Sequence, residues 1–221
     1  YAQWSANKYT IVYNSNKPST ASGTISGATA SSSHTYDVVK KLTDNGYKLT
    51  GWTFAGWNTE ADGSGTSYAN GESVVNLVSE DSGSKTLYAQ WTANTLTIYF
   101  NNGGATGSPA KTSITCKYDA ACSATTQGTM LNTNHTYEGW TDVNGGTTVK
   151  YNAGASIKNI ITGGSTTLYA VWDACPTATK GTNVASSVLN GVTDNVCRYT
   201  HTCSVGYYNA NHLKKITMKK V

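Results

Sequence analysis

The peptide Tyr-Ala-Gln-Trp occupies residues 1–4, and it returns inside two longer copies, Thr-Leu-Tyr-Ala-Gln-Trp at residues 86–91 and Thr-Leu-Tyr-Ala-Val-Trp at residues 167–172. The three tryptophans are 87 and 81 residues apart, an interval as long as a small domain. The chain is therefore interpreted as a tandem array of two complete units, preceded by the end of a truncated one.

Further segments of the two units match in the same order. The aligned pairs are Tyr9–Asn16 with Leu96–Gly103, Phe54–Thr59 with Tyr137–Asp142, and Ser67–Val74 with Lys150–Ile157. Together with the recurring tryptophan peptide, they resemble the Listeria-Bacteroides repeat, also called the internalin-type B repeat, of bacterial surface and secreted proteins. The expected domains are residues 1–4 as the end of a preceding repeat, 5–92 and 93–173 as two repeats, and 174–221 as a cysteine-containing segment.

Alternation of apolar residues with a period of two predicts the strands. Leu96, Ile98 and Phe100 fall on one face of an extended segment, and the recurring peptide at 86–91 alternates in the same way. A third strand is expected at 53–58, with its counterpart at 136–141. Turns are expected between the strands at four dipeptides, Asn45-Gly46, Asp62-Gly63, Asn102-Gly103 and Asn144-Gly145.

Short helices are expected where the alternation fails, around residues 72–78 and 156–161, and a single helical turn is expected at 37–42. The family resemblance implies a β-grasp-like module, a small mixed sheet curled around a short helix. The expected fold class is therefore α+β and rich in strands, with tandem β-grasp-like repeats followed by a cysteine-containing segment.

A glycine-tryptophan pair recurs in the two repeats, as Gly56-Trp57 and Gly139-Trp140. Glycine inside a strand permits a bulge or the close approach of another segment. Trp57 and Trp140 then have two interpretations. They either fill the same hole in each small core or form a platform on which sugar rings stack.

The five cysteines all lie after residue 115. Cys116 and Cys122 are separated by a stretch short enough for a local turn to close, which predicts a disulfide between them. The pairing of Cys175, Cys197 and Cys203 is left open by the sequence. A zinc site is the alternative for this segment, built from Cys197, His201 and Cys203 with Cys175 or His212 as the fourth ligand. The spacing does not favour zinc, because it contains no Cys-x-x-Cys pair.

Charge and motifs narrow the class of function. Residues 1–173 hold ten lysines against eleven acids, and this near-neutral body argues against nucleic-acid binding. No apolar run is long enough to span a bilayer. No catalytic or cofactor-binding motif is present, so neither enzymatic activity nor a cofactor is expected.

Four weaker candidates are each assigned an ordinary structural role. His34 and His135 are expected at the surface, since no motif gives them a catalytic partner. Asp62-Gly63 is a conceivable calcium loop but is expected to be a hairpin turn. The adjacent acids Glu60 with Asp62, and Glu80 with Asp81, are expected to be solvated rather than to serve glycoside hydrolysis.

These observations predict a non-catalytic repeat region of a bacterial cell-surface or secreted protein, acting as a stalk and as an interaction or adhesion module. A host or matrix protein or a glycan is the expected partner, and the chain is expected to be a monomer outside the cell. The alternative is a carbohydrate-binding module of a secreted enzyme whose catalytic domain lies elsewhere. Its motivation is six tryptophans and fifteen tyrosines in a chain rich in strands.

Overall fold

A computed structural model of the protein describes residues 1–177 and 184–203, and these residues form two compact units. The first unit contains residues 1–96 together with two segments from the second sequence repeat, Cys116–Ala120 and Lys158–Gly164. The remaining described residues form the second unit. The chain therefore passes between the two compact units more than once.

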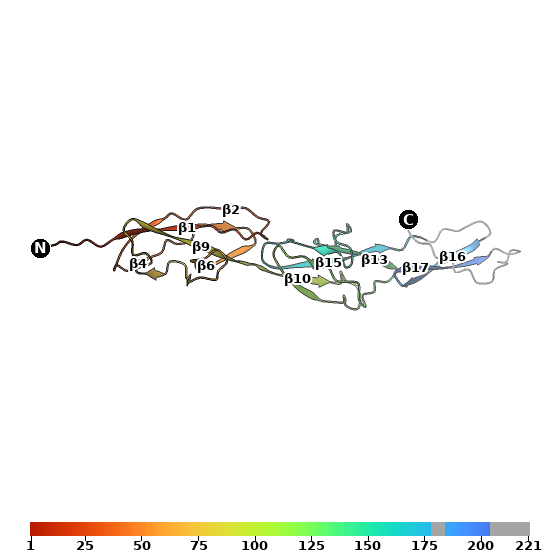
Figure 1. Ribbon diagram of the computed structural model, residues 1–221. Helices are drawn as coiled ribbons and strands as arrows, with labels where there is room; N and C mark the ends of the chain where they lie inside the picture. The colour runs from red at the N-terminus through yellow and green to blue at the C-terminus, as the bar shows by residue number, and fades with distance from the viewer. Residues whose placement is uncertain (178–183, 204–221) are drawn as a thin grey trace. The chain divides into compact units, whose positions relative to one another are not determined.

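The first sequence repeat is built from three long strands and several short ones. Its strands are β1 (Lys8–Asn14), β2 (Ile25–Ser26), β3 (Ser32–Thr35), β4 (Lys40–Lys41), β5 (Lys48–Leu49), β6 (Trp52–Asn58), β7 (Ser67–Tyr68), β8 (Ser73–Val74) and β9 (Gly83–Ala93). The main sheet has the order β2-β5-β6-β9-β1-β3, with β7 paired to β6 (Figure 1). β9 lies at its centre, parallel to β1 and antiparallel to β6.

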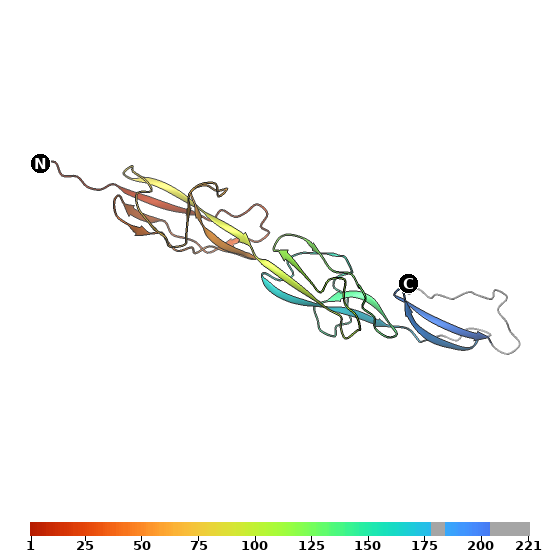
Figure 2. The same cartoon turned by 90° about the horizontal axis from the view of Figure 1, so that it is seen from below.

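The second repeat follows the same plan. Its strands are β10 (Thr95–Asn101), β11 (Ser113–Lys117), β12 (Cys122–Ser123), β13 (His135–Thr141), β14 (Ser156–Ile157) and β15 (Gly164–Ala174). The sheet order is β11-β10-β15-β13, with β13 antiparallel to β15. The antiparallel hairpin of β16 (Val184–Thr193) and β17 (Val196–Cys203) follows, drawn in blue in Figure 2. The strands expected at 53–58, 86–91, 96–100 and 136–141 are all confirmed.

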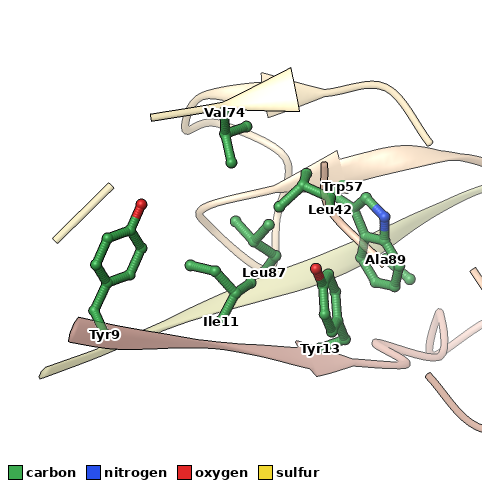
Figure 3. Close-up of a cluster of buried hydrophobic side chains, with 8 residues drawn as sticks. All are labelled: Tyr9, Ile11, Tyr13, Leu42, Trp57, Val74, Leu87 and Ala89. Carbon is green, nitrogen blue, oxygen red and sulfur yellow. The ribbon is translucent and has the colours of Figure 1, made fainter. Parts of the chain in front are cut away.

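Alternation along the strands builds the core of the first unit. Tyr9, Ile11 and Tyr13 are the buried residues of β1, and they lie beside Leu87 and Ala89 of β9. Figure 3 shows these side chains with the three that complete the cluster, Leu42, Trp57 and Val74. β10 has the same pattern of buried and exposed positions as β1, so the two repeats bury equivalent residues.

The expected fold class of α+β is wrong, because no described residue lies in a helix and the fold is all-β. All three predicted helical segments instead contain two-residue strands, since β4 in 37–42 pairs with β8 in 72–78, and β14 in 156–161 pairs with β12. Asn76 and Asn159 follow closely and have φ angles of 55° and 53°, which a right-handed helix does not accept. The β-grasp-like interpretation is corrected with it, because the helix that a β-grasp sheet curls around is replaced by short strand pairs.

The glycine before each buried tryptophan sits at a β-bulge, as its position in the strand predicts. The register shifts between Phe54 and Gly56 in β6 and between Tyr137 and Gly139 in β13. The φ angles of Gly56 and Gly139 are 138° and 147°, values that residues with a side chain rarely adopt. A Cβ atom at Gly56 would lie 2.9 Å from the carbonyl oxygen of Tyr68. Both the backbone angle and the close approach therefore require glycine.

We expect Gly56→Ala and Gly139→Ala each to destabilise its repeat by roughly 1–3 kcal/mol, the usual cost of a strained backbone residue, with the close contact adding to it. Chemical denaturation measures the change. Gly154→Ala is the matched control, because its φ is 72° but a Cβ atom there would meet no other atom within 4 Å. Equal losses at all three positions would show that the close approach contributes nothing.

Candidate functional site

The two tryptophans considered as a stacking platform are fully buried, with 0% of each residue exposed. Trp57 contacts Tyr13 with ring centroids 4.7 Å apart, and Trp140 contacts Phe100 at 4.8 Å. The Trp140 indole Nε1 donates to the carbonyl oxygen of Thr125 at 2.8 Å. Neither ring presents a face to solvent, so their burial favours the packing interpretation.

Substituting these tryptophans separates packing from ligand stacking. We expect Trp57→Ala and Trp140→Ala each to lower the free energy of unfolding by about 3–5 kcal/mol, because each leaves a cavity in a small core. Trp4→Ala is the control, since Trp4 is 93% exposed and should leave the unfolding curve unchanged. An unfolding curve unchanged in the Trp57 and Trp140 variants would contradict the core role.

Four cysteines whose side chains the structure describes form disulfides. Cys175 and Cys197 are bonded across a separation of 22 residues, which ties the chain after β15 to the start of β17. Cys116 and Cys122 are both disulfide-bonded as well, as a bond between them requires. The Cys175–Cys197 bond removes two thiols from the alternative zinc site, and His212 of that site lies outside the described residues.

The expectation that His34 lies at the surface is wrong. The residue is 1% exposed, its Nε2 lies 2.9 Å from the hydroxyl of Ser32, and its ring stacks on Tyr9. Burial, with a smaller effect of Lys40, lowers the pKa of His34 below its ordinary value. His34 is therefore a neutral residue of the packed interior. His135 is partly buried at the start of β13.

Three of the acidic residues singled out in the sequence accept hydrogen bonds from backbone N–H or hydroxyl groups. Asp62 Oδ1 accepts hydrogen bonds from the backbone N–H and the hydroxyl of Ser64, which lower the pKa of Asp62. This arrangement is an Asx turn, and it favours the hairpin-turn interpretation of Asp62-Gly63. Asp81 accepts a hydrogen bond from the backbone N–H of Lys8, and Glu80 accepts one from Ser79.

Asp119, which the sequence motifs do not single out, accepts hydrogen bonds from three separate segments of the first unit. Its Oδ2 accepts hydrogen bonds from the backbone N–H of Ser22 and from the indole Nε1 of Trp52, both at 3.0 Å. Its Oδ1 accepts one from the Asn159 side chain at 2.8 Å. We call Asp119, Asn159, Ser22 and Trp52 the Asp119 clasp. The first two belong to the second sequence repeat and the last two to the first, yet all lie in one compact unit.

A tight turn aims the Asp119 carboxylate at these donors. Asp119 has a φ of 63°, in the left-handed region that aspartate tolerates better than most residues. Its backbone N–H donates to Asn159 Oδ1 at 2.6 Å, which fixes the turn. The ring of the preceding Tyr118 lies directly over the α-carbon of Gly51, where a Cβ atom would meet it at 2.2 Å. The residue before Trp52 must therefore be glycine for Tyr118 to pack there.

The electrostatics of the clasp favour an ionised Asp119. Its side chain is 2% exposed, and desolvation opposes ionisation, but hydrogen bonds from Ser22, Asn159 and Trp52 outweigh it and hold the pKa of Asp119 well below its ordinary value. The half-exposed ammonium group of Lys158 lies 3.9 Å from Oδ1. The clasp is thus a buried carboxylate satisfied by three N–H donors.

We expect Asp119→Asn to lower the melting temperature at neutral pH and to flatten its dependence on acid. A depressed pKa in the folded state means that the stabilisation is complete above the ordinary aspartate pKa of 3.8 and is lost as the pH falls below that value. Thermal unfolding followed by circular dichroism between about pH 2 and pH 7 measures this.

Asp37→Asn is the matched control for the Asp119 variant. Asp37 has the same φ of 63° and hydrogen-bonds Asn76 in the same way, but no indole or serine N–H donates to it among the described residues. Its substitution should leave most of the acid dependence in place. If the melting temperature of Asp119→Asn depends on pH in the same way as that of the parent chain, Asp119 does not stabilise the fold as an ionised acceptor.

Metal-binding clusters and membrane-spanning helices are absent from the described part of the chain. No three or more His, Cys, Asp or Glu side chains gather there in a way that could hold a metal ion. Nor do residues 1–177 and 184–203 contain any helix suited to crossing a membrane.

Comparisons with known proteins agree with the repeated architecture. The family model of the Listeria-Bacteroides repeat domain matches the chain twice, at residues 9–90 and 97–171. The chain is 30% identical over 141 residues to a protein of Evansella cellulosilytica named "Putative Gly-rich membrane protein", a match that covers 63% of this chain and 16% of that relative. A second protein of the same organism, named "Putative membrane protein", is 40% identical over 95 residues, covering 42% of this chain and 13% of that relative.

No solved structure shows significant similarity to the chain. The two family matches cover most of its length, so the chain belongs to the Listeria-Bacteroides repeat family. The resemblance drawn from the sequence is thereby confirmed. The chain spans less than a fifth of the length of the two relatives.

Proposed function

We propose that this chain is the non-catalytic repeat region of a bacterial cell-surface or secreted protein, in which the repeats act as a stalk and as an interaction module. Membership of the repeat family supports the first part, and the names of the two relatives, both membrane proteins by description, support a location at the cell surface. Repeats suit this role because length and multivalency grow with copy number.

The Asp119 clasp is the observation that carries the proposal. A stalk has to resist bending where one repeat follows another, and a single linking peptide cannot supply that resistance. Here residues 116–120 and 158–164 of the second repeat fold into the same compact unit as the first repeat. The hydrogen bonds from Ser22 and Trp52 to Asp119 therefore tie one of these segments of the second sequence repeat to the first repeat, within one compact unit.

The disulfides support an extracellular location. Disulfides persist in oxidising compartments and are rare in the cytosol of mesophiles. Cys116, Cys122, Cys175 and Cys197 are disulfide-bonded, with the Cys175–Cys197 bond joining segments on either side of β16. Alkylation of the protein secreted by its own cells, followed by mass spectrometry, would reveal free thiols if this location is wrong.

Small-angle scattering of the purified chain tests the stalk. We expect a monomer with a maximum dimension much greater than that of a globular protein of the same mass, and a shorter or more flexible particle for Asp119→Asn. A compact globule for the parent chain would overturn the stalk role.

Binding to glycans and extracellular-matrix proteins, arrayed at high density, tests the interaction role. High density is needed because individually weak repeats add their affinities. Selective binding would support the adhesion role. If a folded sample binds nothing on the array, only the stalk role would remain. The alternative of a carbohydrate-binding module receives no support from Trp57 and Trp140, since both are buried.

A further inference from the structure

The first repeat carries its own copy of the turn that holds Asp119. Asp37 follows Tyr36 as Asp119 follows Tyr118, and the φ angle of both aspartates is 63°. The backbone N–H of Asp37 donates to Asn76 Oδ1 at 2.6 Å, and the Asn76 amide donates back to Asp37 Oδ1 at 2.8 Å. The same two hydrogen bonds, at the same two distances, join Asp119 and Asn159.

The surroundings of the two turns also correspond. The backbone N–H of Tyr36 donates to the carbonyl oxygen of Asn7, as that of Tyr118 donates to Asn94, both at 2.9 Å. The side-chain amides of Asn7 and Asn94 each donate to a backbone carbonyl at 2.8 Å. The first repeat therefore contains a turn equivalent to the part of the Asp119 clasp that accepts the hydrogen bonds.

The two turns differ in the groups that donate hydrogen bonds to the aspartate carboxylate. Asp119 is covered by Ser22 and Trp52, whereas Asp37 is exposed and its Oδ2 has no hydrogen-bond donor among the described residues. Exposed valines are next to both residues of the turn: Val38 and Val39 follow Asp37 and Val75 precedes Asn76, and they are 52%, 66% and 44% exposed. An unfilled acceptor beside apolar side chains has the character of an interface that lacks its partner.

We propose that Asp37, Asn76, Val38, Val39 and Val75 form a docking surface for another repeat of the same family, placed before residue 1 of this chain. The inference rests on the proposed function, because it assigns the stalk its upstream contact. A tryptophan indole and a backbone N–H of that repeat donate to Asp37 Oδ2, as Trp52 and Ser22 donate to Asp119.

The register of residues 1–7 identifies a repeat as the occupant. Tyr1–Trp4 is identical to the end of β9 at 88–91, and Trp4 precedes Tyr9 by the same number of positions as Trp91 precedes Leu96. Ala6 and Asn7 are thus the counterparts of Ala93 and Asn94. In the structure Ala93 pairs with Trp52, and the Asn94 N–H donates to the Gly51 carbonyl. A strand equivalent to β6, placed beside residues 1–6, would bring its tryptophan to Asp37.

An extended chain tests this surface. A copy of residues 5–87 is added directly before Tyr1, so that Tyr1–Trp4 completes the strand of the added repeat. We expect Asp37→Asn to lower the melting temperature of the extended chain more than that of the parent chain. In the extended chain we also expect slower hydrogen exchange at the amides of Val38 and Val39. An equal effect of Asp37→Asn in both chains, with unchanged exchange, would overturn the proposal.

A second variant changes a residue of the added repeat only. The residue of the added copy that corresponds to Trp52 is changed to phenylalanine, which keeps an aromatic ring but removes the indole N–H. Combined with Asp37→Asn, it should give a loss smaller than the sum of the two single losses, because both remove one hydrogen bond. Additive losses would contradict the proposed contact. Small-angle scattering of the parent chain tests the stalk role separately. The stalk role and the docking surface can therefore fail independently of one another.

Discussion

A carboxylate withdrawn from water must find hydrogen-bond donors, and Asp119 finds them in residues that the sequence assigns to the preceding repeat. Ser22 and Trp52 donate to one oxygen and Asn159 to the other. Removal of any donor would leave part of a buried charge unsatisfied, so the segments that carry these groups are held to one another. This requirement gives the tandem arrangement a physical basis beyond the linking peptide.

Within each repeat the same arrangement recurs around one buried tryptophan. The indole that follows the bulge at Gly56 or Gly139 is buried in the core, where it packs against Tyr13 of β1 or Phe100 of β10. The tryptophan near the end of the long strand β9 is anchored too, because Trp91 Nε1 donates to the Ser15 carbonyl. The repeated aromatic residues are therefore explained by packing, and the features that link repeats lie at the polar turns instead.

The sequence predicted the parts of the fold that depend on local periodicity. Alternation placed the strands around Leu96 and Trp57 correctly, and the glycine of the bulge could be recognised from its place in a strand. The predictions of helices were wrong because loss of alternation was taken to indicate a helix. Residues 72–78 instead contain a two-residue strand and Asn76 in the left-handed region. The Tyr-Asp pair at 36–37 and 118–119 was a visible signal of the clasp. Its donors were not predictable, because Ser22 and Trp52 lie 97 and 67 positions from Asp119.

The most direct test of this account is the pKa of Asp119, measured by nuclear magnetic resonance from the carboxyl chemical shift as the pH is lowered. Donation from the Ser22 N–H and the Trp52 indole predicts a pKa well below the ordinary value of 3.8. An Asp119 that titrates at the ordinary value would mean that its carboxylate is not held by these donors, and the link between the repeats would have to be sought elsewhere.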